Sequence, residues 1–372
     1  MSHSKHDPSR RYQKILVIAT HCIGDSLLIT PFTRSLRAAY PSAKIDVLIN
    51  ERGGMVFGTN QDIDSLVEIP PRPKMSDYVR LVKQHGRYDL VVNEMLNDRT
   101  AIYSAVFGRQ RLGAIDESLS GSWLKKWVYT HYISEQHRFE HKLSRASRML
   151  ALIGVDMVPE IISPEEPLPA HIEARLPDSY LVVHAPSSNE IKQWPVQSWI
   201  EVIRELSNAG YHLVLSGAPL PRDKMIVEEI LKHCSDSNTI TSVLGELSLA
   251  QTSTLLKRSQ GFVGPDSGPG HMASGYPIPI VSLISVAPAS MWSPWPYKAP
   301  VDETNNLYQN GVSQQRVGNI KLIQSGRNCV PCYANKCRIS DDLYSPCLRD
   351  IKPAQVVDAV IEMIPLGTNN AG

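Results

Sequence analysis

The sequence predicts an α/β protein made of two doubly wound domains in tandem, with a cleft between them. The chain has 372 residues, which is enough for two domains that each build a core. Short β-branched runs alternate with helix-like segments, a pattern typical of parallel βαβ units with right-handed crossovers. The alternation stops at a proline-rich stretch and then restarts. This interruption predicts where one domain ends and the other begins.

The elements follow in order along the chain. In the first half, strands are predicted at 14–19, 44–49, 65–70 and 89–94, and helices at 25–39 and 137–153. Four prolines within 159–169 predict a linker. The second half has strands at 180–185, 212–217, 240–245, 261–265 and 278–284, and helices near 196–209, 221–233 and 248–258 and from about Pro269. The expected divisions are a flexible tail (1–13), a first domain (14–158), a linker (159–178), a second domain (179–351) and a C-terminal helix with its tail (352–372).

Composition and charge exclude several classes of protein. With 42% hydrophobic and 20% charged residues, the chain is not disordered. No apolar run approaches the roughly 18–20 residues of a membrane span, and the N-terminus is polar, so we expect a soluble, cytoplasmic protein. Residues 1–158 hold 22 Lys/Arg against 16 Asp/Glu (+6), and residues 159–372 hold 16 against 21 (−5). This asymmetry indicates either an anionic ligand on the N-terminal side or solvated faces that differ by chance. The chain has no nucleic-acid-binding motif.

The turn after the first strand, T-H-C-I-G-D-S-L-L (20–28), is the first candidate site. Gly24 permits a tight turn from strand to helix, and Asp25 falls at or next to the cap of the following helix. The carboxylate of Asp25 either caps that helix or accepts a proton from an incoming hydroxyl. No Walker or G-x-G-x-x-G loop is present.

Two loops of the second half are the next candidates. In H-A-P-S-S-N-E-I-K-Q-W-P (184–195), the hydroxyls of Ser187 and Ser188 are hydrogen-bond donors. The ammonium of Lys192 suits a phosphate, although a solvated surface lysine is the alternative.

The other loop, G-P-D-S-G-P-G-H-M-A (264–273), follows a strand and opens a short helix. Asp266 and Ser267 are N-cap types, and Gly268 lets backbone N–H groups approach an anion such as a pyrophosphate. The ring of His271, one turn into the helix, either donates to a phosphate oxygen or is structural.

Four cysteines form a cluster with the spacing C-x2-C-x4-C-x9-C, namely Cys329, Cys332, Cys337 and Cys347. Four thiolates in so short a span predict a closed, structural site for zinc or iron. Reduced thiols, or a disulfide formed outside the cell, are the alternatives.

A further segment, S-W-L-K-K-W-V-Y (122–129), interleaves aromatic residues with lysines. It either contacts a membrane surface or a phosphorylated acceptor, or packs as an amphipathic helix on its own domain.

Taken together, these motifs resemble the family 9 glycosyltransferases, the lipopolysaccharide heptosyltransferases and their relatives. The similar features are the I-G-D turn with its L-x-x-T-P helix, the S-S-x-x-x-K-x-W-P loop, D-S-G-P-x-H-x-A, and the C-terminal cysteine region, spread over about residues 14–361. Two segments depart from the family pattern: Ala19 to Cys22 before the I-G-D turn, and V-A-P-A-S-M-W-S-P-W-P (286–296), whose Trp292 and Trp295 suggest an altered donor pocket.

The resemblance implies a GT-B architecture with an N-terminal acceptor-binding domain and a C-terminal nucleotide-sugar-binding domain. The implied activity is inverting, metal-independent transfer of a sugar, typically heptose from ADP-heptose, to a lipopolysaccharide-core, other surface-glycan or protein hydroxyl. Asp25 is the implied general base. The implied donor contacts are Ser187, Ser188, Lys192, Asp266, Ser267, Gly268 and His271. The cysteine cluster is similar to the iron finger of the autotransporter heptosyltransferases. The implied partners are the inner membrane, through peripheral contact, and further copies of the chain in a homo-oligomer. The alternatives are a non-catalytic sugar-nucleotide-binding scaffold and a sugar-nucleotide epimerase or hydrolase.

Overall fold

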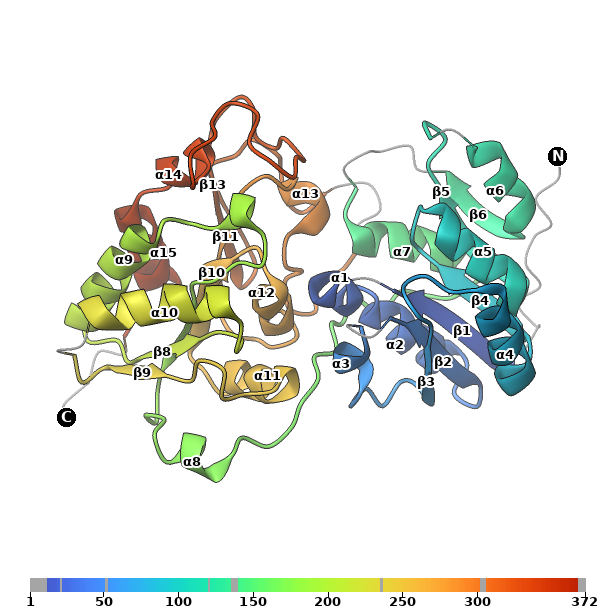
Figure 1. The fold of residues 1–372 in the computed structure, drawn as a ribbon, viewed down its shortest axis with the longest axis horizontal. Coiled ribbons are helices and arrows are strands. Elements are labelled where there is room, and N and C mark those ends of the chain that lie inside the picture. Colours follow the sequence, from blue (N-terminus) through green and yellow to red (C-terminus); the bar gives the residue numbers. More distant parts are fainter. Residues whose placement is uncertain are drawn as a thin grey trace. The chain divides into compact units, whose positions relative to one another are not determined.

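The computed structural model describes residues 12–20, 22–50, 53–119, 121–134, 140–234, 237–301 and 306–366. These residues divide into two compact units (Figure 1). Unit 1 comprises the described residues up to Ile162 and those within 300–306, whereas unit 2 comprises the described residues of 163–299 and from Leu307 onward. Each unit is a parallel or mainly parallel sheet flanked by helices, which confirms the predicted α/β class with two Rossmann-like units. Most of the predicted tails, and His21 of the first motif, lie outside the described residues.

Unit 1 contains a six-stranded parallel sheet in the order β3-β2-β1-β4-β5-β6. The strands are β1 (Lys14–Ala19), β2 (Lys44–Ile49), β3 (Ser65–Glu68), β4 (Tyr88–Asn93), β5 (Gly108–Ile115) and β6 (His131–Ser134). The central strands are buried on both faces, which explains their continuous hydrophobic runs. From β1 the chain adds β2 and β3 on one side of the sheet, and it then returns to add β4, β5 and β6 on the other side of β1. The strand order therefore reverses between β1 and β4, where Val17 pairs with Val92. Ligands of doubly wound sheets bind beyond the strand ends at such a reversal.

The helices of unit 1 cover both faces of this sheet. They are α1 (Ile23–Leu27), α2 (Thr30–Ala39), α3 (Gly54–Phe57), α4 (Met75–His85), α5 (Asp98–Phe107), α6 (Ser122–Val128) and α7 (Lys142–Ala151). α2 and α7 contact each other, and α4, α5 and α6 form a second row in which each helix contacts the next. Right-handed crossovers place the helices that precede and follow the reversal on opposite faces.

Two predicted helices of unit 1 differ from the observed ones. The segment 25–39 forms two helices instead of one, with a break at Leu28 and Ile29. Pro31, near the start of α2, has no N–H to donate to the preceding turn, so a continuous helix would be interrupted there. The helix predicted over 137–153 begins only at Lys142, where the Nδ1 atom of His141 accepts a hydrogen bond from the backbone N–H of Leu143. Residues 137–139 lie outside the described residues.

Unit 2 contains a seven-stranded sheet in the order β12-β13-β11-β10-β7-β8-β9. Its strands are β7 (Leu181–His184), β8 (Leu213–Ser216), β9 (Ile240–Ser242), β10 (Gly261–Pro265), β11 (Ile280–Ile284), β12 (Gln314–Val317) and β13 (Ile320–Gln324). Only β12, which the sequence analysis did not predict, pairs antiparallel among the described strands. The helices are α8 (Ala170–Glu173), α9 (Val196–Asn208), α10 (Pro221–His233), α11 (Leu249–Lys257), α12 (Gly268–Ala273), α13 (Ala289–Trp292), α14 (Pro346–Asp350) and α15 (Pro353–Met363), with a short 3₁₀ turn at Glu190–Lys192.

Two buried tryptophans fix the loop that follows β7. The rings of Trp194 and Trp199 meet edge to face with centroids 4.9 Å apart, a geometry that aromatic pairs favour. The indole N–H of Trp194 donates to the carbonyl oxygen of Leu348 at 3.0 Å, which ties the loop to α14. The loop that carries Lys192 is therefore held against the core of unit 2.

Candidate active site

The reversal of strand order in unit 2 lies between β7 and β10, which pair directly through Val183 and Val263. The loops that follow these two strands carry the two predicted donor motifs. Because the carboxyl ends of parallel strands share one edge of the sheet, the motifs are neighbours although 74 residues separate Lys192 from Asp266.

Lys192, Asp266 and His271 form one cluster at this edge. The Nζ atom of Lys192 donates to Oδ2 of Asp266 at 2.6 Å, and Nε2 of His271 lies 3.7 Å from Oδ1. Burial alone would raise the pKa of Asp266, but the Lys192 ammonium and the adjacent His271 ring outweigh it and hold this pKa below its usual range. The Asp266 carboxylate therefore orients both the Lys192 ammonium and the His271 ring.

Two buried polar atoms beside this cluster have no hydrogen-bond partner. They are Oγ of Ser267, the N-cap residue of α12, and Nδ1 of His271 within the same helix. Buried polar groups in native proteins are nearly always paired, so such orphans indicate groups that a ligand satisfies. At Gly264 the backbones of β10 and β7 lie close together, because a Cβ atom on Gly264 would be 2.9 Å from the carbonyl oxygen of His184. Gly268 is the first residue of α12.

The two predicted serines differ in their exposure. Ser187 is buried, and its backbone N–H donates to Oε1 of Gln193 at 2.8 Å, whereas Ser188 is exposed. Gln193 also donates to the carbonyl oxygen of Ala185 at 3.0 Å and thereby closes the loop on itself. Unit 2 therefore brings Ser187, Lys192, Asp266 and His271 to one edge, with Ser188 at the surface of the same loop.

Unit 1 places Asp25 at the end of β1, next to the other reversal of strand order. Asp25 is the third residue of α1, whose N-cap is Cys22. Its side chain is 27% exposed, and its Oδ1 atom lies 3.8 Å from Nζ of Lys142 on α7. Asp25 is therefore a partly exposed carboxylate with an ammonium nearby, at the end of the strand where the sequence places the candidate base.

A buried ion network that the sequence analysis missed supports Asp25. Glu94 directly follows β4, and its two carboxylate oxygens accept from Lys142 and Arg145, each at 2.7 Å. All three side chains are almost fully buried. The signals in the sequence are the carboxylate after a buried strand and two cations three residues apart, which lie on one helix face. Lys142 thus contacts both Glu94 and Asp25, and the network fixes the position of the ammonium beside Asp25.

The four cysteines of the predicted finger line one cavity of about 330 Å³, together with Ile191, Val286 and Arg338. Burial, followed by the neighbouring Cys329 and Cys332 thiols, raises the pKa of Cys347 to about 11. No disulfide joins these cysteines, and among the described residues no three His, Cys, Asp or Glu side chains stand in a metal-holding arrangement. The predicted four-thiolate metal centre is therefore not confirmed by the positions of the side chains.

Comparisons with known proteins match the chain to transferases. The family model "Glycosyltransferase family 9 (heptosyltransferase)" matches residues 80–318. Lipopolysaccharide heptosyltransferase 3 of Escherichia coli is 28% identical over 312 residues, covering 77% of this chain and 85% of that protein. The structure of the E. coli ADP-heptose lipopolysaccharide heptosyltransferase II has a TM-score of 0.67 at 17% identity, covering 94% of this chain and 98% of that one.

The iron-containing dodecameric glycosyltransferase TibC of enterotoxigenic E. coli is also similar in fold, with a TM-score of 0.53 at 14% identity over 95% of this chain and 76% of that one. At these identities the structural likenesses establish the fold. The family model covers more than half of the sequence, and its match includes both the Lys192 loop and the Asp266 loop. The chain therefore belongs to glycosyltransferase family 9, and it is a glycosyltransferase.

Proposed function

We propose that the protein transfers heptose from ADP-heptose to a hydroxyl of the lipopolysaccharide core, with inversion at the anomeric carbon. The donor and acceptor classes are supported by the names of its relatives, lipopolysaccharide heptosyltransferase 3 and ADP-heptose heptosyltransferase II. Another surface glycan or a protein hydroxyl is the alternative acceptor. We place the reaction in the cytoplasm, at the inner face of the membrane where such glycolipids are assembled.

The observation that carries the proposal is the cluster of Lys192, Asp266 and His271 together with two unpartnered buried atoms on Ser267 and His271, at the start of α12. Ser267 Oγ and His271 Nδ1 can each hydrogen bond to a phosphate oxygen, and Lys192 supplies a positive charge beside them. Preorganised donors and cations are the groups that stabilise a departing diphosphate. We assign Ser187, Ser188 and the backbone of Gly268 to the same donor site. Asp266 acts on the donor through Lys192 and His271, the two side chains that it orients.

The proposed chemical step is a single in-line displacement. The acceptor oxygen forms a bond to the anomeric carbon while the bond from that carbon to the β-phosphate oxygen breaks. The electron pair of the broken bond stays on the diphosphate, next to Lys192 and His271. The proton of the acceptor hydroxyl passes to the carboxylate of Asp25, which Lys142 positions. The positive groups of unit 2 serve in place of a catalytic metal ion.

Replacement of Asp25 by Asn tests this assignment. Loss of the base should lower kcat by about 10²–10⁴-fold while the affinity for ADP-heptose stays within about twofold of wild type. The matched control is Asp178→Asn, which replaces an exposed carboxylate in unit 2. It should leave both kcat and the affinity for ADP-heptose unchanged. Near-normal turnover by D25N would remove Asp25 as the base.

We also propose that the four cysteines hold a structural zinc or iron ion. Four thiols around one cavity are a donor set that suits both metals. The TibC neighbour is described as iron-containing and dodecameric, which supports both a metal and a homo-oligomer in this chain. Metal binding would require the thiols to draw together from their present positions. Elemental analysis of protein purified without oxygen tests the proposal, and a preparation with neither metal contradicts it.

A further inference from the structure

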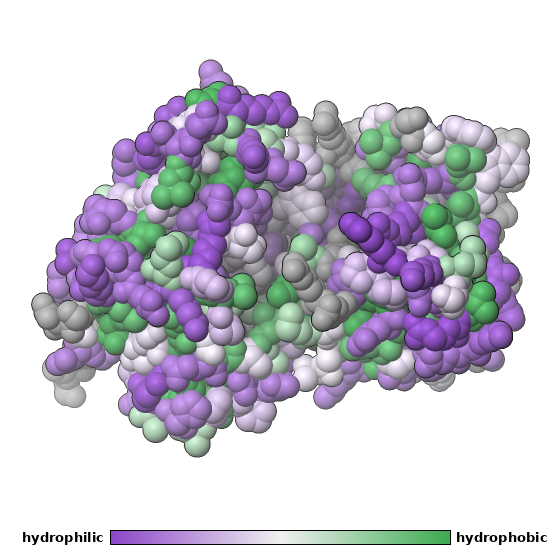
Figure 2. Space-filling view, viewed as in Figure 1, coloured by the Kyte–Doolittle hydropathy of each residue, from purple (hydrophilic) through white to green (hydrophobic). Residues whose placement is uncertain are grey.

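The four cysteines lie in one loop of unit 2 whose two ends are held together. We call residues 325–350 the cysteine segment. Oγ of Ser325 donates to Oδ2 of Asp350 at 2.9 Å, and the guanidinium of Arg327 pairs with the same carboxylate. Many of the residues between these ends are exposed, and Figure 2 shows hydrophilic side chains, with a few hydrophobic ones among them, over much of unit 2. The function of the segment is therefore sought at its buried contacts.

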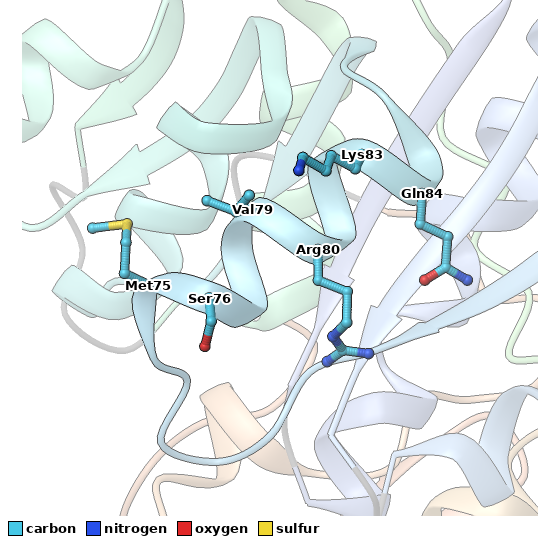
Figure 3. Close-up of a pocket in the computed structure, with 6 residues that line it drawn as sticks. All are labelled: Met75, Ser76, Val79, Arg80, Lys83 and Gln84. Carbon is cyan, nitrogen blue, oxygen red and sulfur yellow. The ribbon is translucent and has the colours of Figure 1, made fainter.

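The groove along α4 in unit 1 is a hollow of another kind. It is open, and its lining comes from that one helix, namely Met75, Ser76, Val79, Arg80, Lys83 and Gln84 (Figure 3). No helix in the described part of the chain, α4 included, is long and apolar enough to cross a membrane. Because its lining residues follow one another on a single helix, the groove joins no two elements of the fold.

The cavity lined by the four cysteines instead joins separate elements of unit 2. Besides the cysteine segment, its walls include Ile191 and Val286. Ile191 directly precedes Lys192 in the loop after β7, and Val286 follows β11. β11 pairs with β10, the strand that leads to Asp266. A change within this cavity can therefore reach the loop that carries Lys192.

The hydroxyl of Ser345 links the cysteine segment to that loop. Ser345 is the N-cap residue of α14, but its side chain makes no capping hydrogen bond to the helix. A serine at this position usually caps its own helix. Here the buried hydroxyl donates instead to the backbone carbonyl oxygen of Ile191 at 3.3 Å. Ser345 therefore holds the residue next to Lys192.

The indole of Trp194 is a second link between the same two elements. Trp194 lies two residues after Lys192 and is fully buried. Its N–H donates to the carbonyl oxygen of Leu348 at 3.0 Å, and Leu348 directly follows Cys347 on α14. The loop is thus held on both sides of Lys192, by Ser345 before it and by Trp194 after it. Both contacts involve the turn of α14 that carries Cys347.

We propose that Ser345 is a positioning residue of the donor site and couples the cysteine cavity to nucleotide binding. The inference rests on the proposed function, because the nucleotide is the ligand that Lys192 would hold. Ser345 acts through Ile191 and Lys192 and does not touch the nucleotide. A bound nucleotide needs the loop in the position that Ser345 stabilises, so it opposes local opening between α14 and the loop. By thermodynamic linkage, the nucleotide then also protects the buried thiol of Cys347.

Ser345→Ala tests the positioning role in calorimetric titrations with ADP. Loss of one neutral hydrogen bond should raise the Kd for ADP about two- to tenfold. S345T keeps the hydroxyl beside a cavity with room for a methyl group, so it should recover most of the affinity. The matched control is Ser259→Ala, because the buried Ser259 hydroxyl donates to the carbonyl oxygens of Leu256 and Gly261, at the start of β10. S259A should lose similar stability in urea and bind ADP as wild type does.

A double-mutant cycle shows whether Ser345 acts through Lys192. K192Q already lacks the ammonium, so adding S345A should change its Kd for ADP by less than about 1.5-fold. Additive effects of the two substitutions, or wild-type affinity in S345A, overturn the positioning role. Hydrogen exchange of residues 187–194 gives a readout without nucleotide, and it should be faster in S345A than in wild type or S259A. If wild type does not bind ADP, the proposed donor is wrong, whereas this exchange still decides whether Ser345 positions the loop.

Alkylation by iodoacetamide tests the coupling to the cysteine cavity. Cys347 and Cys234 are each 7% exposed in unit 2, so the reagent reaches either thiol only when the surrounding structure opens. Saturating ADP should slow the alkylation of Cys347 about fivefold, as measured by mass spectrometry, and leave that of Cys234 unchanged. In S345A this protection of Cys347 should disappear. Equal alkylation of Cys347 with and without ADP, or protection that persists in S345A, overturns the coupling.

Discussion

Replacement of Lys192 by Gln should weaken nucleotide binding and destabilise unit 2 at the same time. The wild-type ammonium is 28% exposed and lies 2.6 Å from the nearly buried Asp266 carboxylate. A hydrogen bond to a charged group contributes about 1.5–3 kcal/mol, so its loss should raise the Kd for ADP by about 10- to 150-fold. Removal of one partner from a buried ion pair costs about 3–5 kcal/mol, and the partial exposure of Lys192 favours the lower end.

The double variant K192Q/D266N separates these two effects. It removes the stranded carboxylate together with the ammonium, so much of the free energy of unfolding lost in K192Q should return. Its affinity for ADP should stay as weak as that of K192Q, because the cation is still missing. Calorimetric titration with ADP and urea denaturation measure the two quantities. An ADP affinity of K192Q within twofold of wild type, or its recovery in the double variant, would refute the role of Lys192.

Three further predictions concern other buried groups. His271→Ala should raise the Kd for ADP about tenfold in calorimetry, and an unchanged Kd would remove the ring from the donor site. Glu94→Gln removes the buried carboxylate charge that Lys142 and Arg145 share, so urea denaturation should show a loss of about 3–5 kcal/mol; a loss below about 1 kcal/mol would contradict the buried network. Burial lowers the pKa of His184 from 6.5 to about 4, so between these values the unfolded chain binds a proton that the folded one does not. The free energy of unfolding should therefore fall by about 1.4 kcal/mol for each unit that the pH drops over this range. His184→Asn should flatten that dependence, and an unaltered slope would show that another group causes it.

The clustering of the candidate donor residues was predictable because each of them lies in a short motif directly after a strand. Once the strands at 180–185 and 261–265 are recognised as parallel, their following loops must share one edge of the sheet. The motifs at Lys192 and Asp266 could therefore be assigned to one site from the sequence. Their direct contact, and the orphaned Ser267 and His271 atoms, depend on side-chain positions that local patterns do not encode.

The ion network of unit 1 was not predictable in the same way. Glu94 lies 48 residues before Lys142 and 51 before Arg145, and charged residues on a helix are usually solvated. Their burial follows from the packing of α7 on the sheet, which a hydrophobic pattern alone does not reveal. The break between α1 and α2 was also missed, although Pro31 signals it, because the apolar spacing continues across Leu28 and Ile29.

Acceptor-dependent release of ADP is the most direct test of the proposed reaction. The purified protein is mixed with ADP-heptose, with or without a lipopolysaccharide core that lacks its outer heptose, and ADP and the glycolipid product are quantified together. The account predicts one heptosylated acceptor for each ADP released, and almost no ADP when the acceptor is omitted. Release of ADP at the same rate without the acceptor would instead indicate a hydrolase, and binding of ADP-heptose with no turnover toward any tested acceptor would contradict the transfer step.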